Sequence, residues 1–572
     1  DETAFQLLET ATALPVEVLA DRQRYDLLLF AQNLAEREDV TVRAAAVLLL
    51  GWLRPAIATQ DVVLHSLRDM DCAGSASLAL LRAMTAGELT GESPPPLDEA
   101  AVAQIFLDNL KTATPWIIKE INIRLLTGFA QTGGGHLLHI ATHLTNLVKV
   151  SDQVTVRHAA GGALLAIAPL LAAEERNEVA VELGRGLEIG QQEFSKYIPG
   201  YLGRFCLFLP PTQLEEMLSD LDASLCSSNG RVVALALDTV GVVYEEYDTY
   251  RVRFPEEDEV YRRRRERLLG MLLKGLAGFR AEVRQEALFV LGRHVFGSEA
   301  LGRHEKRRAF LLTLKKILAL MGEEQASELT FYYRAAMLGR VYRFLTEQEL
   351  LHGGFRFEPP RPAAFFPGTF DPFTLSHKGI VRAIRNLGYE VMLAIDEFSW
   401  SKKTQPHRVR RRIAAISTAG EFHVHLFPED FPVNIANPEN LAALRAAFPG
   451  REVAIVAGSD VVANASSYHK APEPSSIHSF DHIIFRRSAG EGESAEPDYS
   501  AITGTVTELT LPTHLEDISS TRIREAVDQG RDISNLIDPV AQEFIYRRGH
   551  YLPEPQDKPL LRVEDLSIHR TL

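Results

Sequence analysis

The stretch FFPGTFDPFTLSHKGIVRAI, 365–384, decides the fold of the second half of this chain. Its apolar start is typical of a buried strand, and its end has the apolar spacing of a helix. Gly368 lies in the loop between them and allows a ligand to approach the backbone closely. Free backbone N–H groups at the start of the helix favour phosphate. The stretch therefore predicts a strand, an anion-binding loop and a helix.

The same alternation of strand and helix continues to the end of the chain. The predicted strands are AAFFPGTF (363–370), EVMLAIDEF (390–398), EFHVHLF (421–427), EVAIVAGSD (452–460), DHIIFRRS (481–488) and TVTELTLP (505–512). Helices are predicted after His377, Pro406, Pro438, Asp460, Ser520 and Pro539. This order indicates an α/β doubly wound, Rossmann-like sheet of parallel strands, which binds ligands beyond the carboxyl ends of its strands.

The first 352 residues predict helices only, because Leu and Ala recur at three- and four-residue spacing. Similar sequences begin at Val42, Ile118, Val156, Val232 and Val283. The first three intervals are 76, 38 and 76 residues, which fit the period of about 40 residues of HEAT repeats. The last interval, 51 residues, is longer by about the length of a charged insertion that begins near Arg251. We predict an all-α HEAT-like solenoid, with an irregular helical domain as the alternative.

A glycine- and proline-rich stretch separates the two halves. Gly353 and Gly354 precede FEPPRP (357–362), and such stretches are typical of linkers between domains. We predict a helical-repeat domain over 1–352, a linker over 353–362 and the α/β domain over 363–572.

The composition excludes several classes of protein. Of the 572 residues, 46% are hydrophobic and 24% are charged, as in ordinary globular proteins. The apolar run 159–173 is too short to cross a membrane, and a net charge of −15 disfavours binding to nucleic acid. The three scattered cysteines cannot form a disulfide framework. We therefore expect a cytoplasmic protein with neither a membrane nor a nucleic-acid partner.

The loop of the deciding stretch resembles the signature GxFDPxHxGH of the HxGH nucleotidylyltransferase superfamily. The chain has Gly368-Thr369-Phe370-Asp371-Pro372, followed by Thr374-Leu375-Ser376-His377. Thr374 stands at the first histidine position, as it does in phosphopantetheine adenylyltransferases. Ser376 stands where the family has glycine, and His377 is the second histidine of the signature.

A second motif lies further along the chain. Ile518-Ser519-Ser520-Thr521-Arg522-Ile523-Arg524 matches ISSTxIR of the same superfamily at every fixed position. Hydroxyl side chains cap a helix start, and Arg524 lies one turn inside the helix, where a guanidinium can meet phosphate oxygens. The two motifs in this order imply a nucleotide-binding domain of this superfamily.

Within the superfamily, the resemblance is closest to nicotinate- and nicotinamide-mononucleotide adenylyltransferases. Gly458-Ser459-Asp460 follows a strand, as the family's G-x-D does, and Ser467-Tyr468-His469-Lys470 falls where that family often has Trp before Lys. The ending GRDISNLIDPVAQEFIYRRGHY, 530–551, is similar to the family's ending. Tyr468 is a candidate either to lie near the pyridine ring or to pack in the core.

The resemblance implies adenylyl transfer, in which the phosphate of the mononucleotide attacks the α-phosphate of ATP to give a dinucleotide and pyrophosphate. The catalytic residues that it implies are His377, Arg524 and Lys402. The residues that it implies for binding ATP or the acceptor are Gly368, Thr369, Phe370, Thr374, Lys403, Gly458, Asp460, Ser519, Ser520 and Thr521. Mg²⁺ is expected with ATP, held mainly by nucleotide oxygens and water, and no metal site built by the protein is expected.

The segment SKKTQPHRVRRRI, 401–413, begins soon after a predicted strand. Either Lys402 or Lys403 could neutralise the triphosphate. We predict that the run 410–412 of three arginines forms a solvated helix face.

Two other functions remain compatible with the sequence. One keeps the fold and changes the substrate, as a cytidylyltransferase or an adenylyltransferase for another acceptor. The other is a scaffold, in which the helical repeats bind a protein and a degenerate transferase domain senses nucleotide. Ser376 motivates the scaffold, whereas His377 and the intact second motif favour an enzyme, with a protein partner still expected for the repeats.

Overall fold

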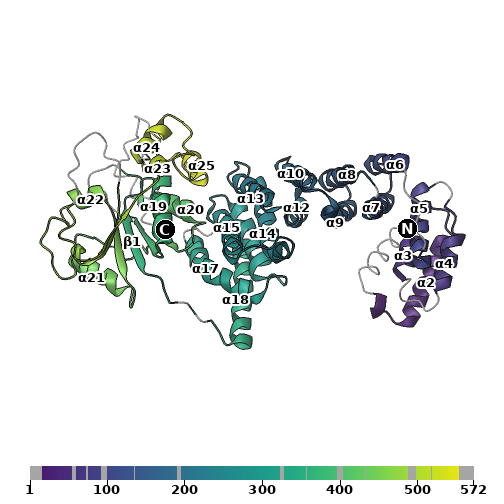
Figure 1. Ribbon diagram of the computed structural model, residues 1–572, viewed down its shortest axis with the longest axis horizontal. Coiled ribbons are helices and arrows are strands. Elements are labelled where there is room, and N and C mark those ends of the chain that lie inside the picture. Colours follow the sequence, from purple (N-terminus) through teal and green to yellow (C-terminus); the bar gives the residue numbers. More distant parts are fainter. Residues whose placement is uncertain are drawn as a thin grey trace, which may run out of the picture. The chain divides into compact units, whose positions relative to one another are not determined.

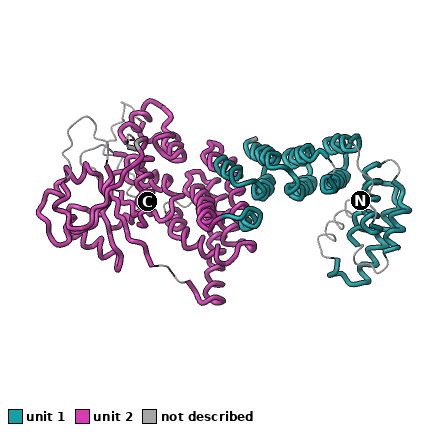
Figure 2. Tube along the Cα trace, in the orientation of Figure 1, with its two compact units in different colours: residues 1–221, 246–256 teal, residues 222–245, 257–572 magenta. Residues whose placement is uncertain are grey.

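The structure, a computed structural model, falls into two compact units (Figure 2). It describes residues 16–53, 60–72, 75–91, 99–133, 135–189, 195–322, 328–355, 357, 359–395, 404–431, 433–486, 498–516, 518 and 520–552. The first unit comprises 1–221 and 246–256, and the second comprises 222–245 and 257–572. The predicted linker, 353–362, lies inside the second unit. The predicted domain limits themselves stay a prediction.

Every regular element in the described residues before 353 is a helix, as predicted (Figure 1). The α-helices are α2 (Asp21–Ala35), α3 (Val40–Leu53), α4 (Gln60–Asp69), α5 (Ala76–Thr90), α6 (Glu99–Leu110), α7 (Trp116–Gln131), α8 (Leu137–Val150), α9 (Val154–Ile167), α10 (Ala173–Ile189), α12 (Ile198–Cys206), α13 (Pro211–Ser224), α14 (Gly230–Arg253), α15 (Asp258–Ala277), α16 (Ala281–Val290), α17 (Arg303–Gly322) and α18 (Glu328–His352). Short 3-10 helices cover η1 (Val16–Val18) and η3 (Ala168–Leu170), and η4 (Leu291–Phe296) is a π-helix. None of the described helices is long and apolar enough to span a bilayer.

The five recurring sequences begin at equivalent places in five helices. Each starts at the third residue of its helix: Val42 in α3, Ile118 in α7, Val156 in α9, Val232 in α14 and Val283 in α16. The four valines are buried. In the first unit, α7 packs against both α3 and α9. Helices that carry the same sequence at the same place and stack on one another form a helical-repeat region.

The arginine that follows the repeat valine has a structural role in at least two repeats. Arg157 is fully buried and donates to the carbonyl of Ser151, six residues earlier. Arg284 Nη1 donates in the same way to the carbonyl of Gly278, at 2.9 Å. The extra length near Arg251 is taken up by the two long helices α14 and α15, of 24 and 20 residues, and the turn between them.

The C-terminal part forms a sheet of six parallel strands in the order β3-β2-β1-β4-β5-β6, which confirms the predicted α/β class. The strands are β1 (Ala363–Gly368), β2 (Glu390–Ile395), β3 (Val424–Leu426), β4 (Val453–Gly458), β5 (Asp481–Phe485) and β6 (Val506–Leu509). The strand order changes direction between β1 and β4. Ligands of open α/β sheets bind beyond the carboxyl ends of the strands at such a switch point.

Helices follow the strands at the predicted places. They are α19 (Leu375–Asn386), α20 (His407–Thr418), α21 (Pro438–Ala446), α22 (Ser459–Asn464), α24 (Ser520–Asp528) and α25 (Pro539–Arg548), with the short α23 (Thr513–Glu516) and the 3-10 helix η5 (Ile477–Ser479).

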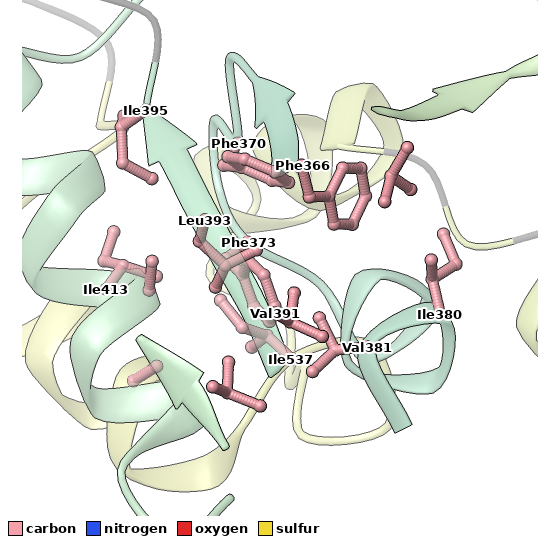
Figure 3. Close-up of a cluster of buried hydrophobic side chains, with 14 of the residues drawn as sticks. Phe366, Phe370, Phe373, Ile380, Val381, Val391, Leu393, Ile395, Ile413 and Ile537 are labelled. Atoms are coloured by element: carbon pink, nitrogen blue, oxygen red, sulfur yellow. The ribbon is translucent and has the colours of Figure 1, made fainter. Parts of the chain in front are cut away.

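Alternation along β1 sends side chains into a separate core on each face of the sheet. Ala363 and Phe365 join a core with residues of α21 and α22. Ala364 and Phe366 join the other, with residues of α19, α20, α24 and α25. Figure 3 shows this second core, in which Phe366 gathers with side chains of β2 and α19. The strands and helices of the sheet thus bury their own apolar faces.

Within the second unit, the last repeat helices are bonded to the sheet domain. Lys316 Nζ of α17 donates to the carbonyl of Thr418 at 2.6 Å, and Arg412 Nη2 donates to the carbonyl of Ala277 at 2.9 Å. A Cβ on Gly270 would lie 2.9 Å from the carbonyl oxygen of Gly420, so α15 makes close backbone contact there. The sheet domain has its own core, yet it shares polar contacts with α15 and α17.

Candidate functional site

A cavity of about 840 Å³ opens at the carboxyl edge of the sheet. Its walls include the last residue of four strands, namely Gly368 of β1, Ile395 of β2, Gly458 of β4 and Phe485 of β5. The volume is within the range of small-molecule sites. The cavity therefore occupies the switch point between β1 and β4, where this fold binds ligands.

Most of the residues singled out from the sequence meet at this cavity. Those that line it are Gly368, Thr369, Phe370, His377, Gly458, Asp460, Ser520, Thr521 and Arg524. Thr374 is buried, and its hydroxyl lies 3.0 Å from Nδ1 of His377. Lys402, Lys403 and Ser519 lie outside the described residues.

The hydrogen bonds of His377 fix which ring nitrogen carries its proton. The backbone N–H of Thr374 donates to Nδ1 of His377 at 3.0 Å, so Nδ1 is an acceptor and Nε2 carries the hydrogen of the neutral ring. The hydroxyl of Thr374 in turn caps α19 by accepting from the backbone N–H of His377 at 3.2 Å. Ser376 lines the cavity beside this histidine and adds a hydroxyl at the family's glycine position. His377 is therefore held as a hydrogen-bond donor at the start of a helix, where anions bind.

The loop before α19 is tightly folded. Phe370 has a φ of 44°, in the left-handed region that residues with a side chain rarely adopt. Its ring packs edge-on against Phe366 and His377. A Cβ on Gly368 would lie 2.9 Å from that ring, so the turn needs glycine there.

The two motifs are bonded to each other. Ser520 Oγ donates to the carbonyl of Pro372 at 3.1 Å, and Arg524 Nη1 donates to the carbonyl of Asp371 at 2.8 Å. A second nitrogen of Arg524, Nη2, donates to Thr521 Oγ1 at 3.1 Å. These contacts bring a histidine and an arginine from distant parts of the chain to one cavity.

The far wall contains residues that the sequence analysis missed. Arg411 Nε lies 3.0 Å from Glu429 Oε1, and His407 Nδ1 lies 3.5 Å from the same oxygen. Asn434 and Asn440, beyond β3, also line the cavity. These residues lie in α20, in α21 and in the segment between β3 and α21, all of which follow predicted strands. The carboxyl edge of the predicted sheet was therefore the signal that could have indicated them.

The prediction of a solvated face for the three consecutive arginines is wrong. Arg410 is 1% exposed and donates to the carbonyl of Thr369 at 2.6 Å. Arg411 lines the cavity, and Arg412 donates to the carbonyl of Ala277 in α15. Successive residues of a helix are about 100° apart, so the three arginines point in three directions, and none of them is fully exposed.

The alternative that Tyr468 packs in the core is the one that the structure supports. This side chain belongs to the core with α21 and α22, and its hydroxyl is 3.1 Å from His482 Nε2. It is absent from the cavity wall.

In the described part of the chain, no group of three or more His, Cys, Asp or Glu side chains could hold a metal ion. The cavity wall combines donor side chains with carboxylates, namely His377, Arg411 and Arg524 with Asp371, Glu429 and Asp460. Donors such as His377 and Arg524 can orient an anionic ligand and stabilise charge that develops on it.

Comparisons with known proteins match the sheet domain. Residues 365–526 match the cytidylyltransferase-like family model. The probable nicotinate-nucleotide adenylyltransferase of Pelodictyon phaeoclathratiforme is 25% identical over 223 residues, which cover 34% of this chain and 97% of that protein.

Two solved structures match different parts of this chain. Plasmodium falciparum nicotinic acid mononucleotide adenylyltransferase complexed with NaAD is 18% identical, over 33% of this chain and 97% of its own, with a TM-score of 0.28. Kap121p is 14% identical, over 60% of this chain and 40% of its own, with a TM-score of 0.27. Residues 365–526 thus form a cytidylyltransferase-like domain, and the two motifs meet at its switch-point cavity.

Proposed function

We propose that the sheet domain transfers the adenylyl group of ATP to nicotinate or nicotinamide mononucleotide and so makes a dinucleotide for NAD synthesis. The observation that carries this proposal is the meeting of His377 and Arg524 at one cavity, at the switch point of the sheet. Similarity to a probable nicotinate-nucleotide adenylyltransferase over nearly all of that protein's length supports the choice of acceptor.

The reaction needs no covalent intermediate. A phosphate oxygen of the mononucleotide forms a bond to the α-phosphorus of ATP, and the bond from that phosphorus to the bridging oxygen of the β-phosphate breaks. Pyrophosphate leaves with the electron pair, and no proton has to be removed from the ionised attacking phosphate. The protein therefore has to align two anions and stabilise the developing charge.

The proposed roles combine the resemblance to the superfamily with the positions of the described residues in the cavity. His377, with Nε2 protonated, donates to the α-phosphate and stabilises the transition state. Arg524, with Ser519, Ser520 and Thr521, holds the β- and γ-phosphates, and Asp460 lies against the nucleotide. Thr369 lines the phosphate loop, while Thr374 fixes His377 through the hydrogen bonds at Nδ1.

Mg²⁺ enters as part of the substrate, Mg·ATP. We expect this ion to be carried mainly by triphosphate oxygens and water. In this proposal Lys402 or Lys403 adds positive charge to the triphosphate.

The test is an assay of pyrophosphate release with the full chain, Mg²⁺ and either ATP or CTP. The acceptors are nicotinate mononucleotide, nicotinamide mononucleotide, phosphopantetheine and glycerol phosphate. We expect release with ATP and a pyridine mononucleotide, with a slight preference for the nicotinate form. Release with phosphopantetheine or glycerol phosphate alone would refute the acceptor, and release with CTP alone would refute the adenylyl donor.

The helical repeats supply a second part of the proposal. We infer that they bind a protein partner in the cytoplasm, since stacked repeats form extended surfaces suited to binding. A chain that binds ATP and transfers nothing to any acceptor would favour the scaffold with a nucleotide-sensing domain.

A further inference from the structure

Asp371, in the first motif, is a buried carboxylate whose two oxygens have different surroundings. The residue is 3% exposed. Its Oδ1 accepts a hydrogen bond of 2.6 Å from the hydroxyl of Tyr551 and a longer one, of 3.4 Å, from the backbone N–H of Gln405. Its Oδ2 lies 3.6 Å from Arg524 Nη1 and has no hydrogen-bond donor among the described residues. The carboxylate therefore interacts with Arg524 through one oxygen and is held through the other.

Tyr551 comes from the end of the sheet domain, 180 residues after Asp371. It is 7% exposed, and its ring belongs to the same core as Phe366 and Phe544. Burial, and next the charge of Asp371, raise the pKa of the phenol. The hydroxyl thus keeps its proton at all ordinary pH values and can act only as the donor to this carboxylate.

Arg524 is the member of this group that reaches the cavity. Its side chain is 29% exposed, and it lines the cavity while Nη1 donates to the carbonyl of Asp371. Asp371 Oδ2 at 3.6 Å is close enough to attract the guanidinium and too far to saturate it. A carboxylate free to rotate could form a shorter, two-oxygen pair with Arg524, because guanidinium and carboxylate favour bidentate contact.

We propose that Tyr551 is a positioning residue for the triphosphate: by holding Oδ1 of Asp371, it keeps Arg524 from closing onto that carboxylate and so leaves the guanidinium available to the β- and γ-phosphates. This inference rests on the proposed function, because it takes the cavity as the ATP site. The ring of Tyr551 fills the core, while its hydroxyl sets the direction of the carboxylate.

The test distinguishes contacts to the β- and γ-phosphates from contacts to the rest of the nucleotide. We expect Tyr551→Phe in the full chain to weaken Mg·ATP binding about tenfold, the effect of weakening one charge-assisted contact, and to leave AMP binding unchanged. Calorimetric titration with each nucleotide measures both. General damage to the fold would weaken both nucleotides alike. In the Arg524→Ala background, Tyr551→Phe should have no further effect on ATP affinity, because the group that it positions is gone.

Tyr546→Phe is the matched control. It makes the same change on α25, where the hydroxyl donates to the carbonyl of Arg531, away from Asp371. If Tyr551→Phe does not fold, Asp371→Asn keeps the tyrosine and still predicts a changed ATP affinity with unchanged AMP affinity.

The outcomes are distinguishable. Equal ATP affinity in wild type and Tyr551→Phe, or equal losses for ATP and AMP, would overturn the inference while leaving adenylyl transfer untouched. If Tyr551→Phe weakens ATP binding and spares AMP binding, as predicted, but the wild-type chain transfers nothing to any acceptor, only the proposed function is overturned. A wild-type chain that binds no ATP would overturn both.

Discussion

Two buried carboxylates of the sheet domain, Asp371 and Glu421, differ in how fully they are paired. Glu421 contacts three cations, with Arg382 Nη2 at 2.6 Å, Arg385 Nη1 at 2.5 Å and Lys378 Nζ at 4.0 Å. Asp371 has the hydroxyl of Tyr551 and the backbone N–H of Gln405 on one oxygen and Arg524 at 3.6 Å from the other. Glu421 is surrounded by protein partners, whereas Asp371 borders a cavity.

The difference separates stability from binding. A carboxylate whose partners are all protein groups contributes to the fold, and removing it leaves buried cations uncompensated. Asp371 Oδ2 accepts no hydrogen bond from the described residues, so the neighbouring guanidinium of Arg524 is still able to bind a ligand in the cavity. Helix α19 joins the two clusters, since His377 lines the cavity and Lys378 Nζ lies 3.1 Å from Asp538 Oδ2 in the paired cluster. Changes around Asp371 and the cavity should alter activity, and changes in the paired cluster around Glu421 should alter stability.

The largest effect is expected at the cavity. His377→Ala should lower turnover at least about a hundredfold, because one donor to a developing charge contributes about 2.7–4 kcal/mol. ATP affinity and the free energy of unfolding should change far less. Pyrophosphate release at saturating substrates measures the loss. His514→Ala, at an exposed histidine of α23, is the control with normal turnover. Near-normal turnover of a folded His377→Ala protein would show that this motif is not the active site.

The opposite pattern is expected at the paired carboxylate. Burial alone would raise the pKa of Glu421, but the hydrogen bond and charge of Arg382 and the charges of Lys378 and Arg385 outweigh it and lower the pKa. Glu421→Gln should therefore reduce the free energy of unfolding by about 2 kcal/mol, a value discounted because Arg382 is largely exposed. Urea unfolding measures it. ATP affinity should stay within about twofold, which is less than 0.5 kcal/mol. A loss of ATP affinity without a loss of stability would reverse the contrast between the clusters.

The sequence could predict those features of the fold and of the site that depend on residues close together in the chain. Alternating apolar runs located all six strands, and the recurring Val42 and Val156 mark the same place in α3 and α9. The near wall of the cavity was predictable because Gly368 to His377 is one continuous motif. Its partner motif resembles the same superfamily, so Arg524 was found as well.

The rest depends on contacts between distant residues. His407, Arg411 and Glu429 meet because β2 and β3 end at the same edge, and the strand order that brings their loops together is a property of the whole sheet. Tyr551 reaches Asp371 across 180 residues, with no pattern in either segment to indicate the pair. The buried Arg410 was predicted to be solvated because a charged run gives no sign of the carbonyl groups that surround it.

The smallest expected effect tests the excess of positive charge in the paired cluster. Lys316 of α17 is buried, and burial, opposed by Glu421 and aided by Arg385 and Lys378, lowers its pKa from 10.5 to about 7. Between pH 7 and 10.5 the unfolded chain holds a proton that the folded chain has released, so stability must rise with pH across this window. Below pH 7 the folded protein keeps the buried ammonium, and the destabilisation is complete.

Lys316→Met removes this titration. The stability of the wild type minus that of the variant should therefore increase by about 1–2 kcal/mol from pH 7 to pH 9, whatever constant offset the lost hydrogen bond to Thr418 adds. Urea unfolding at pH 6, 7, 8 and 9 gives the difference curve. Lys315→Met is the control, because the neighbouring Lys315 side chain is 68% exposed and pairs with Glu390. Its curve should stay parallel to that of the wild type over the same range. Parallel curves for Lys316→Met as well would mean that the cluster neutralises its buried charges completely, and the contrast with Asp371 would then rest on geometry alone.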